Sequence, residues 1–436
     1  MTNPLQQFAP LLDKDFMAAA LQRHLPECVA GHWQILDCRI QHPRYKTYRS
    51  PENLGKSFLS LVYQVQGRDP VSALIEHRLI YARAFLGKLS QLRFEQAQIH
   101  NQSDSLIHVA ELGLVGWRFP DDPAMPWLTD VLNAPHIGDS STPITAIEII
   151  NYRPETRCTA RYQIQAADSS VIETVYGKTY VDNRGWAIYQ NLLSLQAQTA
   201  KSFVLPQALG YDLEHQTLWL QALPGEALSK ALLAPQPVLP VDTLVKALAG
   251  FHRLKLLDLQ TITAKQQLQE WQKKAGTLSY AYPEITKPLQ ALLSYLQSNC
   301  PTVQALSLIH GDFHIDQLAI MPNGCLALFD YDELALGSPL QDLANFAADL
   351  YNYPLAIAQL DKWVIELFAA YSAASLQPVT DIEFLWHLRG QLLTRAYRSH
   401  IQQKPDTARC VADFITLALR PWPTANQEFP DHDAYK

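Results

Sequence analysis

The 436-residue sequence has few cysteines, and they are not spaced for metal binding. No two cysteines have C-x-x-C spacing, and no paired Cys/His cluster suggests a zinc site. Cysteines spread this thinly over a long chain are typical of free thiols in a reducing compartment. The six positions are Cys28, Cys38, Cys158, Cys300, Cys325 and Cys410.

The sequence also lacks an excess of positive charge and any long apolar run. Its 35 Lys and Arg residues are outnumbered by 42 Asp and Glu residues, for a net charge of −7, whereas a nucleic-acid binder normally shows a basic face. No run approaches the ~20 apolar residues of a membrane span. The apolar pattern of residues 1–26 is interrupted by Asp13, Lys14 and Asp15, which favours an amphipathic helix over a signal peptide. We therefore expect a cytoplasmic protein with neither a nucleic-acid nor a membrane partner.

The sequence does contain enough apolar material for more than one domain. Hydrophobic residues make up 48% of the chain and charged residues 18%, a composition typical of globular proteins with a substantial core. The pattern suggests two successive strand-rich units followed by a helical unit. A Pro- and Asp-rich stretch over residues 120–143 indicates a boundary between the first two units. We expect domains at residues 1–140, 141–225 and 226–436.

Hydrophobic periodicity predicts the elements within these units. In residues 75–92 apolar side chains recur at three- and four-residue intervals, which predicts a helix. Strands are expected within residues 33–66 and near residues 106–119. The second unit is expected to hold strands at residues 144–150, 161–165, 171–181, 204–211 and 217–223, with a helix over residues 185–198. Beyond residue 227 we expect mainly helices, interrupted by loops and strands over residues 307–330.

Three polar motifs in the helical unit fit the chemistry of phosphoryl transfer. The transfer needs a carboxylate to accept the proton of the attacking hydroxyl, and oxygen ligands for metal ions that neutralise the triphosphate. Asp312, in LIHGDFHIDQ, follows an apolar strand and can serve as the proton acceptor. Gln317 can offer a carbonyl oxygen to a metal. Asp330 ends the apolar run of LALFDYDE, so a strand would bring its carboxylate to the same place.

The clustering of acidic residues in these motifs also favours a bound cation. Asp330 and Asp332 would repel each other and Asp312 without one, which indicates magnesium. An alternative is that Asp and Gly here only form turns. Three motifs in this order and spacing favour the functional interpretation.

These motifs resemble the catalytic and metal-binding loops of the aminoglycoside phosphotransferase/choline kinase superfamily. That family has H-G-D-x-x-x-x-N, then a metal-binding Asp after a strand, then G-x-P-x-x-D-L. His310 to Asp312 match the first motif, Asp330 the second, and Gly337 to Leu343 the third, with Asp342 as its structural aspartate. The resemblance implies an α+β, protein-kinase-like fold with two lobes, in which His310 braces the catalytic loop around Asp312. It also implies ATP and one or two Mg²⁺ ions as cofactors.

The chain departs from the family pattern at Gln317, where Asn is usual. Glutamine keeps the carbonyl oxygen but extends the side chain by one methylene. The same substitution occurs in the maltokinase-like and glucosamine-kinase-like branch, which tends to have an additional N-terminal cap. Residues 1–140 would correspond to such an α+β cap, and we expect it to pack on the N-lobe and to contribute none of the chemistry.

The resemblance also implies nucleotide contacts in the N-lobe. LWLQALPGEAL resembles the hinge that holds adenine, with Gln221 and Leu223 as its contacts. Lys178 lies where the family has its phosphate-binding lysine, although an exposed face of the strand is an alternative. No Gly-rich loop precedes it. Arg157, in the turn YRPETR, could reach phosphates instead, or the turn could be only a charged hairpin connection. No helix Glu is evident as a partner for Lys178.

The sequence thus predicts an ATP-dependent kinase that phosphorylates a hydroxyl of a small molecule. Gln317 and the N-terminal extension favour a sugar or amino sugar, and an aminoglycoside is the close rival. The absent Gly-rich loop and Gln317 would also fit a nucleotide-binding pseudokinase or regulatory module, which the intact Asp312 and Asp330 disfavour. A protein kinase is disfavoured because no activation segment separates Asp330 from Gly337.

Overall fold

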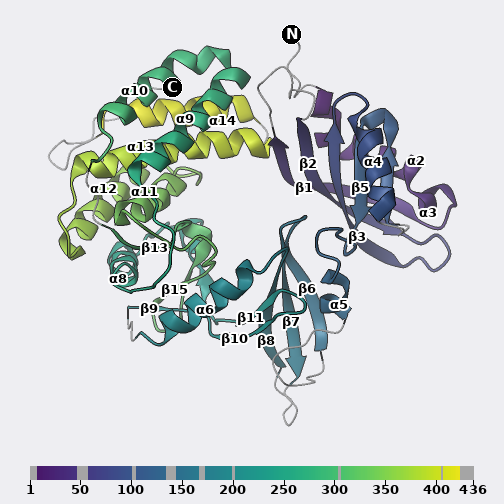
Figure 1. Ribbon diagram of the computed structural model, residues 1–436, viewed down its shortest axis with the longest axis horizontal. Helices are drawn as coiled ribbons and strands as arrows, with labels where there is room; N and C mark the ends of the chain where they lie inside the picture. Colours follow the sequence, from purple (N-terminus) through teal and green to yellow (C-terminus); the bar gives the residue numbers. More distant parts are fainter. Residues whose placement is uncertain are drawn as a thin grey trace.

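The computed structural model describes the chain in three parts that lie around a common centre (Figure 1). One strand-rich part is formed by the first third of the chain, a second by the next hundred residues, and a helical part by the rest. The residues described are 7–46, 57–100, 105–133, 144–165, 172–198, 202–302, 306–403 and 406–422. The expected boundary near residue 140 lies outside them.

The first part, which we call the cap, is built on a five-stranded antiparallel sheet in the order β1-β2-β3-β5-β4. Helix α2 packs on β1, and side chains on that face form a core of their own with Leu21, Tyr63 and Val65 at its centre. The elements are η1 (Ala9–Leu12), α2 (Lys14–His24), α3 (Pro26–Val29), β1 (Gln34–Lys46), β2 (Phe58–Arg68), β3 (Ile75–Phe85), α4 (Leu89–His100), β4 (Leu106–Val109), η3 (Ala110–Leu112) and β5 (Leu114–Arg118).

The predicted helix over residues 75–92 is wrong. Ile75–Phe85 is strand β3, and the helix begins only at Leu89. Strand β3 lies between β2 and β5, so Ile80 and Tyr81, which face opposite sides, are both buried. A strand buried on both faces has no apolar alternation, and its apolar residues can mimic helical spacing.

The second part is another five-stranded antiparallel sheet, in the order β10-β11-β8-β7-β6. Helix α6 packs against β8, β10 and β11. Its strands and helix agree with the sequence-based expectations, except that residues 203–204 pair with a strand of the helical part instead. The elements are α5 (Leu128–Asn133), β6 (Ile144–Arg153), β7 (Arg157–Gln165), β8 (Ile172–Tyr180), α6 (Arg184–Gln196), β9 (Phe203–Val204), β10 (Ala208–Asp212) and β11 (Thr217–Gln221).

The helical part holds the largest core, which extends into α6 and the second sheet. Two small sheets interrupt the helices, β13-β16 and β12-β14-β15-β9, and they support the polar motifs. The elements are β12 (Glu226–Ala227), α7 (Leu228–Leu232), α8 (Val241–Phe251), α9 (Ala264–Ala281), η4 (Pro283–Ile285), α10 (Thr286–Ser298), β13 (Ser307–Ile309), η5 (Ile315–Gln317), β14 (Leu318–Ile320), β15 (Leu326–Leu328), β16 (Ala335–Gly337), α11 (Pro339–Leu350), α12 (Ile357–Ala374), α13 (Asp381–Gln402) and α14 (Thr407–Leu419). The expected α+β fold with a strand-rich lobe and a helical lobe is confirmed.

The cap contacts both of the other parts. Tyr81 and Trp117 of the cap share an apolar cluster with Tyr152 of the second sheet. On the other side, the ring of Tyr45 on β1 meets the ring of His400 on α13 edge-on, with centroids 6.1 Å apart. The cap therefore packs on the N-lobe, and strand β1 also reaches the helical lobe.

Two further sequence-based expectations concern the whole chain. All six cysteines are free in the structure. Among the described residues, none of the helices has the length and hydropathy needed to span a bilayer.

The packing of α9 against α13 generates a stability prediction. A Cβ atom on Gly390 of α13 would clash with the ring of Trp271, which is buried on α9. Replacing Gly390 by Ala should therefore destabilise the protein by about 1–3 kcal/mol through overpacking, although Ala is favoured over Gly in a helix by about 1 kcal/mol. Urea unfolding of the Gly390→Ala variant would measure the change.

Gly210→Ala is the matched control, because a Cβ at Gly210 on β10 would meet no atom within 4 Å. We expect its free energy of unfolding to stay within about 0.5 kcal/mol of the wild-type value. A Gly390→Ala variant as stable as this control would contradict the tight α9–α13 contact.

Candidate active site

The catalytic-loop motif lies where strand β13 ends. His310, Gly311 and Asp312 follow Ile309 directly, and Gly311 has a φ of +81°. This left-handed conformation favours glycine, and a Cβ there would also clash with the backbone carbonyl of Glu333. The sharp turn at Gly311 leads the chain from the buried strand to Asp312.

The carboxylate of Asp342 stabilises this turn by hydrogen bonds. Asp342 lies in the first turn of α11 and is fully buried. Its oxygens accept hydrogen bonds from the backbone N–H groups of His310, at 2.6 Å, and Gly311, at 3.0 Å. The ring of His252 is 3.1 Å from the same carboxylate. One side chain thus satisfies two backbone donors of the catalytic loop, which agrees with the structural role expected for Asp342.

His310 joins the catalytic loop to the metal-binding loop. Its ring is fully buried, and Nε2 lies 2.8 Å from the carbonyl oxygen of Phe329, the residue before Asp330. This contact corresponds to the bracing role expected for His310, and we treat it as a positioning residue.

Asp312 itself is surrounded by basic groups. Its Oδ1 accepts a hydrogen bond of 3.1 Å from Arg398 of α13, and its Oδ2 is 3.5 Å from Nε2 of His314. Burial opposes ionisation of Asp312, but the hydrogen bonds and charges of His314 and Arg398 outweigh it and hold the carboxyl pKa below its usual range. The side chain is therefore a carboxylate at neutral pH and able to accept a proton or hydrogen bond.

A second set of charges connects the N-lobe sheet to the metal-binding loop. The ammonium of Lys178 on β8 lies 2.6 Å from Oδ1 of Asp330 and 2.6 Å from Oδ1 of Asp332. The guanidinium of Arg157 on β7 also pairs with both carboxylates. The hydroxyl of Tyr180 donates to Asp332 at 3.0 Å. Two cations and two carboxylates thus meet between the lobes.

This arrangement answers the question of a partner for Lys178. Lys178 is 8% exposed, so the alternative of an exposed strand face is wrong, and its partners are aspartates of the helical lobe. Burial opposes ionisation of Asp330, but the charges of Lys178 and Arg157 outweigh it and keep its pKa below the usual range. Asp330 also has a φ of +62°, a conformation that Asp tolerates better than most residues and that is concentrated at functional sites.

The donor set at this place fits magnesium. Asp330 and Asp332 supply two carboxylates, and the amide nitrogen of Gln317 lies 3.3 Å from Oδ2 of Asp330, so the amide oxygen belongs to the same group. Mg²⁺ is usually held by one or two carboxylates together with phosphate oxygens and water. Among the residues that the structure describes, there is no cluster of three or more His, Cys, Asp or Glu side chains suited to a metal. The two carboxylates and the amide are nevertheless enough for a site completed by a nucleotide.

The remaining two predicted nucleotide contacts lie at the end of strand β11 and just after it. Gln221 is the last residue of β11 and is exposed, with its backbone N–H bound to the carbonyl of Gln207. Leu223 is half-buried in the connection to β12. Their role in holding adenine stays a prediction.

A cavity of about 440 Å³ opens beside Asp312 between α9, α11 and α13. Most of its wall is polar, and seven of the side chains are amides. Gln267 and Gln341 bond each other, yet Oε1 of Gln267 is buried without a hydrogen-bond partner. The lining residues are Gln260, Ile262, Gln266, Gln267, Gln269, Glu270, Trp271, Lys274, Gly311, Asp312, Gln341, Asn345, Gln391, Thr394 and Arg398.

Sequence reasoning missed Arg398 of α13, the residue that contacts Asp312. Two other arginines of this helix make different contacts: Arg389 lies over the ring of Tyr295, and Arg395 is buried against Asn345. The spacing of Gln391 and Arg398, seven residues or two turns apart, was the available signal that both lie on one helix face.

The chain was compared with protein families and curated proteins. A model of the phosphotransferase enzyme family matches residues 187–382, which include Asp312, Asp330 and Asp342. Acyl-CoA dehydrogenase family member 11 of Homo sapiens is 30% identical over 128 residues, which are 27% of this chain and 16% of that protein. The same protein of Pongo abelii is 30% identical over 129 residues. The chain thus spans only 16% of the length of these curated relatives.

Solved structures resemble the chain at low identity. A choline kinase of Streptococcus pneumoniae is 11% identical, with a TM-score of 0.43, and the match covers 63% of this chain and 92% of that one. A thermostable mutant of an aminoglycoside phosphotransferase, in ternary complex with AMP-PNP and hygromycin B, is 12% identical. Its TM-score is 0.46, with 63% and 93% of the two chains covered.

The role of Asp342 generates a prediction. In Asp342→Asn, one carboxylate oxygen is replaced by an NH₂ group, which cannot accept a hydrogen bond. The backbone N–H of either His310 or Gly311 would then lose its acceptor and remain unpaired in the core. We expect the free energy of unfolding to fall by about 2–5 kcal/mol, as measured by urea unfolding.

Asp413→Asn on α14 is the control, because Asp413 is exposed and its ion pair with Arg409 is long, at 3.8 Å. That variant should be within about 0.5 kcal/mol of wild type. Equal stability of the two variants would show that Asp342 does not hold the loop.

Proposed function

We propose that this chain, whose residues 187–382 match the model of the phosphotransferase enzyme family, transfers the terminal phosphate of ATP to a hydroxyl group of a small, polyhydroxylated molecule. The observation on which the proposal depends is the position of Asp312. Its carboxylate lies at the wall of an amide-lined cavity, and the loop that carries it is joined through His310 to the loop of Asp330.

Asp312 is proposed as the group that orients the acceptor hydroxyl and accepts its proton. Its low pKa makes it a weak base in the ground state, and Arg398 and His314 keep the carboxylate in place. Phosphoryl transfer depends mostly on positioning and electrostatic stabilisation, so a fixed carboxylate suits the task. The proton would pass from the hydroxyl to Asp312 as the oxygen bonds to phosphorus and the ADP oxygen leaves.

The charged groups between the lobes are proposed to bind the triphosphate. Magnesium, when bound with ATP, neutralises the charge of the phosphate oxygens. Asp330, Asp332 and Gln317 would hold the metal, and Lys178 and Arg157 lie close enough to these carboxylates to reach phosphates bound there. Arg157 would thereby supply part of what a Gly-rich loop supplies elsewhere. Gln221 and Leu223 would contact the adenine.

The acceptor is proposed to be a sugar or amino sugar. Amide side chains donate and accept hydrogen bonds and therefore suit a ligand with many hydroxyls. The buried Oε1 of Gln267 lacks a donor among the described groups, and an acceptor hydroxyl would provide one. An aminoglycoside is less well matched, because Lys274 and Arg398 place positive charge on the cavity wall.

The first test of the proposal removes the carboxylate of Asp312. Asp312→Asn keeps the size of the side chain but cannot accept the proton, and general-base help is typically worth 10²–10⁴-fold. We expect ADP release from MgATP, in the presence of a panel of sugars and amino sugars, to fall by at least about 100-fold, with an unchanged thermal unfolding midpoint.

Asp316→Asn, an exposed residue of the same loop, is the control and should keep wild-type turnover. Activity of Asp312→Asn within about threefold of wild type would refute the catalytic role. A wild-type protein that binds MgATP but turns over no acceptor would favour the pseudokinase alternative.

The second test concerns the metal ligands. Because a carboxylate binds Mg²⁺ far better than a neutral amide, Asp330→Ala should weaken MgATP binding by about tenfold or more, and Gln317→Ala by less. Calorimetric titration of MgATP, with ATP in EDTA as the reference, would measure the magnesium-dependent part of the affinity. If Asp330→Ala bound MgATP as tightly as the wild type does, Asp330 would not be a metal ligand.

A further inference from the structure

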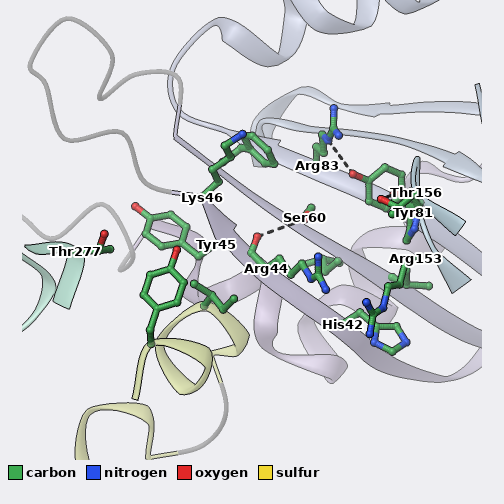
Figure 2. Close-up of a pocket in the computed structure, with 16 residues that line it drawn as sticks. His42, Arg44, Tyr45, Lys46, Ser60, Tyr81, Arg83, Arg153, Thr156 and Thr277 are labelled. Carbon is green, nitrogen blue, oxygen red and sulfur yellow. Dashed lines mark hydrogen bonds between the residues drawn. The ribbon is translucent and has the colours of Figure 1, made fainter. Parts of the chain in front are cut away.

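A second cavity, of about 520 Å³, lies between the cap, the turn that joins β6 to β7, and helices α9 and α13. Figure 2 shows the side chains that line it, with those of Arg44, Arg153 and His42 gathered on one side. Sixteen residues line the cavity, and none of them is acidic. Its positively charged lining residues are Arg44, Lys46, Arg83 and Arg153. The chain as a whole has a net charge of −7, so this concentration of positive charge is local.

One wall of the cavity is the second face of the cap sheet, opposite the cap core. Ser60 on β2 pairs with Arg44 on β1 and with Arg83 on β3, so the three side chains form a row across the sheet. Arg44 reaches this face because β1 contains a bulge between Gln41 and Arg44, where His42 has a φ of +49°. The extra residue reverses which side chains face the cavity.

A second wall of the cavity is the turn that bears Arg153. The buried carboxylate of Asp122 accepts hydrogen bonds from the backbone N–H of Glu155, at 2.7 Å, and from the hydroxyl of Tyr152, at 2.8 Å. Glu155 in turn pairs with Arg83 of the cap. The turn is therefore attached to the cap, and Arg153 is held facing Arg44.

The two guanidinium groups lack partners of opposite charge. Within the described residues, the side chains of Arg44 and Arg153 have neither a hydrogen bond nor an ion pair, whereas Arg83 is neutralised by Glu155. Burial and then the charges of Arg157 and Arg44 lower the pKa of Arg153, and the charges of Asp330 and Asp312 oppose this shift. Burial and then the charges of Arg153 and Arg44 do the same for His42. Like charges brought together with no carboxylate ion-paired to them are unfavourable, and a bound anion would relieve the repulsion.

The cavity and the amide-lined cavity of Asp312 are lined by neighbouring residues of α9 and α13. Thr277 and Tyr397 line the former, while Lys274, one turn earlier on α9, and Arg398, the next residue on α13, line the amide-lined cavity of Asp312. Lys274 bonds the hydroxyl of Thr394, at 3.1 Å. Burial and then the charge of Arg398 lower its pKa to about 8. Lys274 and Arg398 therefore place positive charge on the side of the Asp312 cavity that adjoins Thr277 and Tyr397.

We propose that the acceptor is an anionic molecule, whose carboxylate or phosphate group is bound by Arg44 of the cap and Arg153 of the N-lobe while its hydroxyl lies at Asp312. This proposal rests on the proposed phosphotransferase function and defines its substrate class. The cap then contributes to substrate selection, contrary to the sequence-based expectation that it contributes none of the chemistry.

The triphosphate of ATP is the other anion that these arginines could bind. Lys178 and Arg157 already face the metal-binding carboxylates from β7 and β8. Arg44 comes from the cap and shares its cavity with Tyr397 and Ile401 of α13, the helix that also contacts Asp312. The geometry therefore favours the acceptor side, and an experiment with the nucleotide site filled separates the two sources.

The first experiment measures binding of radiolabelled sulfate to the full chain by equilibrium dialysis, with the protein saturated by the ATP analogue Mg·AMP-PNP. We expect the wild type to bind sulfate in the millimolar range or tighter. Arg44→Gln and Arg153→Gln should each raise the Kd by about tenfold or more, the usual effect of losing a charge-assisted contact. Arg39→Gln is the matched control, because Arg39 lies on β1 before the bulge and pairs with Asp37.

The outcomes separate the proposals. No sulfate binding to the wild type would overturn the anion site, as would equal affinity in Arg44→Gln and Arg39→Gln. Sulfate that binds only without AMP-PNP, together with weaker AMP-PNP binding by Arg44→Gln, would assign the arginines to the nucleotide and overturn the acceptor proposal. Failure of AMP-PNP to bind would refute the proposed function, and the sulfate titration without nucleotide would still decide the anion site.

The second experiment compares acceptors of one skeleton: glucose, glucosamine, glucuronate and glucose 6-phosphate, each with MgATP. We expect kcat/KM in the wild type to be at least about tenfold higher for an anionic member than for glucose. Arg44→Gln should remove this preference by raising the KM for the acceptor, with the KM for MgATP unchanged. A wild-type preference for glucose or glucosamine would overturn the proposal.

Discussion

The pairing of buried charges between the lobes is the constraint on which the site depends. Lys178 and Arg157 come from the N-lobe sheet, and Asp330 and Asp332 follow a strand of the helical lobe. Charges this far from water are costly unless paired, and removing one partner leaves the others uncompensated. The four side chains therefore fix where the sheet lies relative to the metal-binding loop.

The catalytic loop is held by a separate set of contacts. Asp342 binds the backbone of His310 and Gly311 from below, and the ring of His310 contacts the carbonyl of Phe329. The ring of His310 links the two loops, so a shift of the loop that carries Asp330 would also displace Asp312. The site is thus assembled from backbone positions fixed by buried polar side chains, and the half-buried carboxylate of Asp312 is oriented by Arg398 and His314.

Sequence reasoning predicted the arrangement of residues correctly where they lie in contiguous motifs. Asp312, Asp330 and Asp342 each lie in a short motif next to a strand or helix, and the structure brings them together as expected. It failed where contacts come from separate elements. Sequence reasoning found no partner for Lys178, because its partners Asp330 and Asp332 lie 152 and 154 residues away. The cationic cavity was missed because Arg44 and Arg153 meet only once strand register and the bulge are known.

The bulge in β1 has a consequence for how this protein can diversify. Cys38, before the bulge, and Tyr45, after it, both face the cap core. Even-numbered side chains therefore face the core just before the bulge and odd-numbered ones after it, because the bulge adds one residue. Loss or gain of one residue there would present a new set of side chains to the cavity while leaving Asp312, Asp330 and Asp342 untouched. If both proposals hold, ligand preference and phosphoryl chemistry are encoded in separable stretches of the chain, and one can change in evolution while the other is retained.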